Sequence, residues 1–208
     1  MFQLDSVFFR FITNLGSIII VSILWAICCI PIITIVPSTA ALYYTCVKVI
    51  RHDRGYLFLE FFHSFRSNLK QGVFITLLAL LFGWLLYVDY NYITTLNPVP
   101  YYLTAVYRTA LIFYVCLLIY ITLNLSRFSM SIIGLLKLSL FMMIRHFYLS
   151  FIMLVLVVAT GILIRAIPVT LLILPGIYIL LTSLVMEKIL KKYMPQIKEN
   201  ANHWYYDE

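Results

Sequence analysis

Long stretches without Asp, Glu, Lys or Arg constrain this chain more than any other feature. Apart from the stretch Tyr90–Tyr107, whose first half is a polar loop sequence, five such stretches, of 37, 18, 18, 19 and 21 residues, occur along the sequence. A helix rises about 1.5 Å per residue, so about 20 apolar residues cross the ~30 Å hydrocarbon core of a bilayer. Each stretch is long enough to hold a membrane-spanning helix. They lie between Arg10 and Lys48, Lys70 and Asp89, Arg108 and Arg127, Arg145 and Arg165, and Arg165 and Glu187.

The composition excludes most other classes of protein. Of the 208 residues, 63% are hydrophobic and 11% are charged, whereas a typical soluble domain carries about 25% charged residues. An ordinary soluble enzyme domain, a secreted disulfide scaffold and a disordered chain are therefore excluded. Backbone groups in hydrocarbon must pair within the chain, and the sequence lacks the two-residue alternation of barrel strands, so the spans are predicted to be helices.

The predicted fold is all-α: a polytopic membrane helix bundle with about five transmembrane helices and in-plane amphipathic helices on the cytoplasmic side. Residues 1–195 are expected to form a single transmembrane domain, and residues 196–208 a C-terminal cytoplasmic tail. The predicted spans are Leu15–Val36, Gly72–Tyr92, Tyr102–Leu125, Phe147–Ala166 and Val169–Leu190.

The basic residues predict the orientation of these spans. Twelve of the 15 Lys and Arg residues fall between spans one and two, between spans three and four, or from the last residues of span five onward. Basic residues accumulate in cytoplasmic loops, so the N-terminus is expected outside the plasma membrane and the C-terminus in the cytoplasm. The net charge of +7 then reflects topology and contact with the lipid bilayer, and no nucleic-acid partner is predicted.

The segment between the first two spans is expected to contain two helices. Pro31 and Pro37 predict a kink or stop, after which Ser38 or Thr39 can cap a helix running to about Ile50. Asp53-Arg54-Gly55 indicates a turn.

An amphipathic helix is predicted at Leu57–Leu69, with Phe58, Phe61, Phe62, Phe65 and Leu69 on one face. Such a helix can lie on the membrane surface as a plain linker, or its apolar face can dock onto a partner.

Three charged residues near the outer ends of the spans form a second candidate site. Asp89, Arg108 and Arg165 are predicted to lie at a similar depth. Charged residues within spans are rare and often functional, so we hypothesise that Asp89 pairs with Arg108 or, less favourably, with Arg165. Alternatively, each arginine extends to the outer headgroups.

No motif for catalysis or for a cofactor is recognisable. The sequence contains no Gly-rich phosphate loop, nucleophile elbow or Cys/His catalytic pairing. Glu60 and His63 have the spacing of two metal ligands on a helix, but the other histidines supply no second pair. We therefore predict a protein that is not an enzyme and that has neither a cofactor nor a metal site.

Two sequence blocks carry a family resemblance. The first runs from Leu24-Trp25 through Pro31-Ile32-Ile33-Thr34-Ile35-Val36-Pro37-Ser38-Thr39-Ala40-Ala41-Leu42-Tyr43 to the basic Lys48 and Arg51, and the second runs from Phe61 to Gln71. Together with Pro175-Gly176 near the end, these blocks resemble the YesL family of bacterial membrane proteins. That family has no established biochemical activity, but its members typically occur in Gram-positive bacteria beside carbohydrate ABC importers.

The resemblance implies a role in saccharide uptake. The expected function is a non-enzymatic accessory subunit of a carbohydrate (oligosaccharide) ABC importer, with the importer's permease subunits as partners. An independent small transporter or channel for a saccharide or related solute is the alternative. The residues expected to contact the partner are Phe58, Phe61, Phe62, Phe65, Arg51, Arg54 and Arg66.

Overall fold

The computed structural model describes residues 2–95 and 101–193, which are helical with short connections, as predicted. The predicted tail at 196–208 lies outside the described residues. The α-helices are α1 (Phe2–Cys28), α2 (Ile35–Thr45), α3 (Leu57–Thr95), α4 (Tyr101–Arg127), α5 (Ile132–Arg145), α6 (Phe147–Ala166) and α7 (Leu174–Tyr193). Two short 3₁₀ helices, η1 (Ile32–Thr34) and η3 (Pro168–Leu172), and one π-helix, η2 (Cys46–Arg51), connect them.

Four helical stretches are long and apolar enough to cross a membrane within the described residues: Ile32–Arg51, Leu57–Thr95, Tyr101–Arg127 and Phe147–Ala166. Their outer surfaces carry large exposed apolar side chains, including Leu81 and Trp84 on α3 and Phe151 on α6. Apolar surface of this extent is covered by lipid or protein rather than by water. The chain is therefore a membrane protein.

The predicted spans agree with the helices where charged residues bound them. The span Phe147–Ala166 coincides with α6, and Tyr102–Leu125 lies within α4. The fifth span, predicted at Val169–Leu190, is divided between η3 and α7, because Pro168 begins a separate 3₁₀ turn. The apolar part of α7, Leu174–Glu187, is shorter than the four long stretches.

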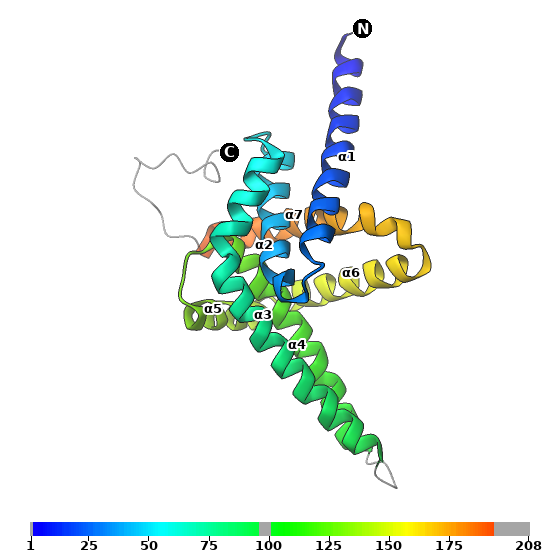
Figure 1. Cartoon of the computed structure of the whole chain (residues 1–208), viewed down its shortest axis with the longest axis vertical. Helices are drawn as coiled ribbons and strands as arrows, with labels where there is room; N and C mark the ends of the chain where they lie inside the picture. Colours follow the sequence, from blue (N-terminus) through cyan, green and yellow to red (C-terminus); the bar gives the residue numbers. More distant parts are fainter. Residues whose placement is uncertain (1, 96–100, 194–208) are drawn as a thin grey trace.

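The first predicted span, Leu15–Val36, differs most from the structure. Helix α1 ends at Cys28, and Pro31 precedes η1 in an extended conformation, because proline cannot donate the hydrogen bond that would continue the helix. The Thr34 hydroxyl donates to the Cys28 carbonyl (2.5 Å) and closes the turn. Helix α2 then begins at Ile35, before the predicted caps Ser38 and Thr39, and folds back along α1 (Figure 1).

Helix α3 joins two elements that the sequence analysis separates. The predicted in-plane helix Leu57–Leu69 and the predicted span Gly72–Tyr92 form one continuous helix of 39 residues. No proline interrupts α3, so the change from a polar to an apolar surface leaves its backbone hydrogen bonds intact. At Gly72 the helix meets α2 closely: an added Cβ would lie 2.8 Å from Pro37. This contact fixes where α2 crosses α3.

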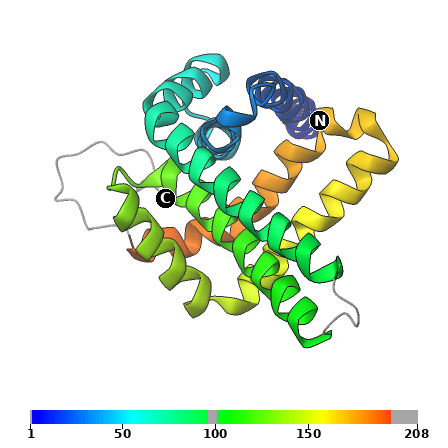
Figure 2. The same cartoon turned by 60° about the horizontal axis from the view of Figure 1, so that its bottom comes forward.

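The core lies where α1, α2, α4 and α7 meet. Val21, Leu42, Tyr120 and Met186 are fully or almost fully buried there. Two helical hairpins, α3–α4 and α6–α7, leave this region in different directions (Figures 1 and 2). The core therefore brings together helices that are distant in sequence, and the ion pair of Arg127 with Glu187 is buried here.

Candidate functional site

The turn between η2 and α3 holds the start of α3 in place. The turn predicted at Asp53-Arg54-Gly55 is confirmed, with positive φ angles of 51° at Asp53 and 86° at Gly55. A side chain at Gly55 would meet the Glu60 carboxylate, whose Oε2 pairs with Lys48 Nζ at 2.7 Å. Glycine suits this position because of both its φ angle and the close approach. The ion pair joins η2 to the first turn of α3.

A group of exposed apolar side chains covers the outside of this first turn. We call Tyr56, Phe58, Leu59 and Phe62 the α3 patch. Their exposed fractions are 78%, 55%, 68% and 41%. The predicted apolar face divides here, because Phe61 is fully buried and Phe65 packs against the core. Of the four predicted contact phenylalanines, Phe58 and Phe62 are therefore the exposed pair.

The three arginines predicted to contact a partner have different environments. Arg51 donates from Nη1 to the Ser183 carbonyl (3.0 Å) and hydroxyl (3.3 Å), so it joins η2 to α7. Arg54 and Arg66 are exposed at the two ends of the segment that carries the α3 patch. The exposed surface thus combines an aromatic centre with basic ends, whereas Arg51 has an internal structural role.

A buried ion-pair cluster joins three helices in the core. Glu187 on α7 accepts hydrogen bonds at Oε1 from Arg127 Nη2 (2.6 Å) and Nε (2.9 Å) on α4, and from the Tyr43 hydroxyl (2.7 Å) on α2. The Arg127 and Glu187 side chains are 2% and 5% exposed. Removing one member of such a pair leaves an uncompensated buried charge, which costs several kcal/mol.

No sequence motif marks the cluster, although one pattern of charges points to it. Arg127 and Glu187 each end an uncharged stretch at the predicted cytoplasmic face. Opposite charges at the same depth in neighbouring helices are candidates for pairing. Their separation by 60 positions in the sequence concealed the contact, because the sequence does not show which helices are neighbours.

The three charged residues of the second candidate site lie on the two helical hairpins, α3–α4 and α6–α7. Asp89 on α3, Arg108 on α4 and Arg165 on α6 all have exposed side chains. Lys48 pairs with Glu60 and Arg127 pairs with Glu187, and neither of these ion pairs includes one of the three residues. Pairing of Asp89 with Arg108 stays a prediction.

Glu60 and His63, which have the spacing of two metal ligands on a helix, lie in different environments. Glu60 pairs with Lys48, and His63 is exposed. Within the part of the chain that the structure describes, no group of three or more His, Cys, Asp or Glu side chains comes together.

Comparison with known proteins assigns part of the chain to a family model. Residues 18–90 match the family described as "Protein of unknown function, DUF624". The matched region extends from α1 through α2 and most of α3, and it includes the turn and the α3 patch. No curated protein matches the chain. No solved structure matches it either.

Proposed function

We propose that this protein is a non-enzymatic membrane subunit that associates with a carbohydrate ABC importer. In this proposal the α3 patch, with Arg54 and Arg66 at its ends, contacts the permease subunits of the importer. The exposure of this aromatic surface on a fixed part of the molecule is the observation that carries the proposal.

The composition of the surface supports binding to protein. Aromatic residues and arginine are enriched at protein interfaces and account for much of their binding energy. A rigid surface also loses less conformational freedom when it binds. Here the Lys48–Glu60 ion pair and the buried Phe61 hold the first turn of α3 in place before any partner arrives.

The family context supplies the identity of the partner. We propose that the uncharacterised family matched by residues 18–90 is the YesL family that the two sequence blocks resemble. Members of that family typically occur beside carbohydrate ABC importers. The location proposed with this function is the bacterial plasma membrane, with the N-terminus outside and the C-terminus in the cytoplasm.

Site-specific photo-crosslinking in native membranes tests the contact. A photoreactive amino acid is introduced at Phe58 or Phe62, and in a matched control at Phe74, which is 50% exposed on the apolar part of the same helix. We expect adducts with an ABC permease subunit from positions 58 and 62 and at least fivefold fewer from position 74.

Two outcomes contradict the proposal. One is equal crosslinking from all three positions, because the α3 patch would then have no special role. The other is sugar uptake by vesicles that contain this protein alone, which favours the independent transporter.

A further inference from the structure

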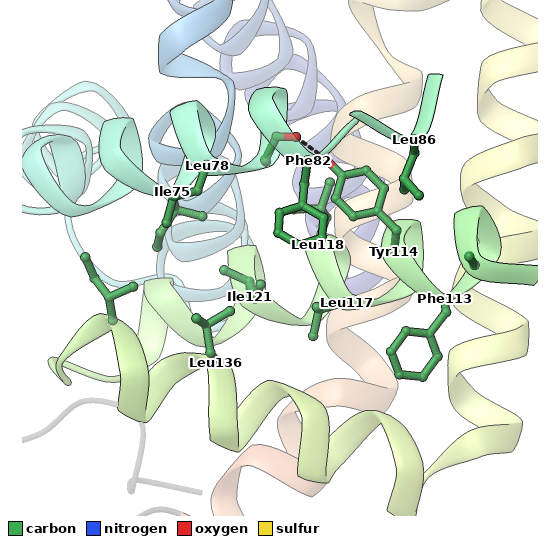
Figure 3. A pocket seen from close by; sticks show the side chains of 13 residues that line it. Ile75, Leu78, Phe82, Leu86, Phe113, Tyr114, Leu117, Leu118, Ile121 and Leu136 are labelled. Carbon is green, nitrogen blue, oxygen red and sulfur yellow. Dashed lines mark hydrogen bonds between the residues drawn. The ribbon is translucent and has the colours of Figure 1, made fainter. Parts of the chain in front are cut away.

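An apolar groove runs between α3, α4 and α5. Its volume is about 460 Å³, and it is lined by apolar side chains together with Tyr114. Figure 3 shows Ile75 and Leu136 toward one end and Leu86 and Phe113 toward the other. The Tyr114 hydroxyl is already engaged, because it donates to the Ala79 carbonyl (2.5 Å). The lining therefore offers hydrocarbon contacts and little hydrogen bonding.

Polar and basic residues adjoin, in sequence, the residues at the end of the groove near Ile75 and Leu136. Gln71 Nε2 donates to the Met130 carbonyl (2.7 Å) and closes α3 against the connection between α4 and α5. Lys70 precedes Gln71, Lys137 follows Leu136, and both lysines are exposed. Two cations thus lie next to residues at one end of an apolar channel.

The two ends of the groove differ in the charged residues next to them. Asp89 on α3 and Arg108 on α4 follow and precede the lining residues Leu86 and Ala110 at the far end, so both signs are present there, whereas α3 has no acidic residue between Glu60 and Asp89 and α5 has none. A lipid with a net negative charge gains more from the two lysines than a zwitterionic lipid, whose headgroup carries no net charge.

We propose that this groove binds an acyl chain of an anionic phospholipid whose phosphate contacts Lys70 and Lys137. The chain occupies the space between Ile75 and Leu86. The phosphate lies at the basic end, where the apolar part of α3 begins. This site is separate from the α3 patch, and it does not depend on the proposed association with an importer.

Lipid binding to the purified full chain in detergent tests the proposal, with native mass spectrometry as the measurement. We expect phosphatidylglycerol to bind about fivefold more tightly than phosphatidylcholine with the same acyl chains. Equal binding of the two lipids by the unsubstituted protein overturns the proposal without any variant.

Two variants with matched controls locate the site. Ala110→Phe fills the groove, whereas Ala105→Phe adds the same bulk to an exposed position of α4 outside it. Lys137→Gln removes a proposed phosphate contact, whereas Arg108→Gln removes an exposed charge elsewhere on α4. We expect at least fivefold weaker phosphatidylglycerol binding for Ala110→Phe, about threefold weaker binding for Lys137→Gln, and no change for either control.

The other outcomes are equally decisive. Unchanged binding by both Ala110→Phe and Lys137→Gln places the lipid elsewhere and overturns the proposal. Competition by glycerol phosphate as strong as that by the intact lipid identifies a site for a free anion, and this also overturns it. Because Lys137 is exposed, its substitution remains informative if Ala110→Phe fails to fold.

Discussion

Glu187 is the residue at which three helices converge. One carboxylate oxygen accepts hydrogen bonds from two nitrogens of Arg127 and from the Tyr43 hydroxyl. Hydrogen bonds to charged groups are stronger than those between neutral groups. Because its partners lie on α2 and α4, Glu187 ties α7 to the part of the molecule that carries the α3 patch.

Glu187→Gln is predicted to destabilise the protein by about 3 kcal/mol, because the Arg127 charge stays buried without its counterion. Glu60→Gln is the matched control: its ion pair with Lys48 is more exposed, at 17% for each side chain, and we expect a loss of about 1 kcal/mol or less. Denaturant unfolding in detergent measures both changes. Equal losses for the two variants contradict a dominant role of the buried cluster.

Individual residues could be predicted where local chemistry decides their conformation. The turn at Asp53-Arg54-Gly55 is of this kind. The apolar face of Phe58, Phe61, Phe62 and Phe65 could be predicted as a face, but not its division into buried and exposed members. That division depends on which residues α2 and the core cover, and so it depends on packing between elements distant in sequence.

The same distinction holds for whole helices. Helices α4 and α6 could be predicted closely because charged residues mark both ends of their apolar stretches. The 37-residue stretch before Lys48 has no internal charge, so one span and two shorter antiparallel helices fit it equally well. Pro31 decided between them by ending α1. For α3 the sequence pattern misled in the opposite direction. The change from a polar to an apolar surface near Lys70 suggested the end of one helix and the start of another, whereas the backbone continues as one helix.

The hairpin of α1 and α2 makes the predicted orientation testable. The start of α1 and the turn before α3 lie at the same end of the molecule (Figure 1), whereas the basic-residue rule places the N-terminus outside and this turn inside. If that rule holds, a membrane-impermeant label reaches an N-terminal tag in intact cells. In a protein without other cysteines, the label reaches Arg54→Cys only after the cells are permeabilised.

Val169→Cys, exposed after α6 and predicted to lie outside, is the control for labelling of intact cells. Protection of both the N-terminal tag and Arg54→Cys would contradict the predicted orientation. It would indicate that α1 and α2 both cross the membrane.

On the scale of the whole molecule, three features share one architecture. The buried cluster holds α2, α4 and α7 together, the turn after η2 presents the α3 patch, and the α3–α4 hairpin carries the apolar groove along its length. The cluster is buried in the core, whereas the α3 patch and the groove lie at the surface of the molecule. The stability of the fold and the proposed binding of partner and lipid therefore involve different residues, and substitutions can alter them separately.

Co-purification from native membranes in a mild detergent tests the central claim most directly. The tagged protein is predicted to retain ABC permease subunits, identified by mass spectrometry. The double variant Phe58→Ala/Phe62→Ala is predicted to lose them at least fivefold, while Phe74→Ala, at a similarly exposed position of α3, retains them. Absence of permease subunits from the unsubstituted protein, or equal recovery with all three proteins, would contradict the account.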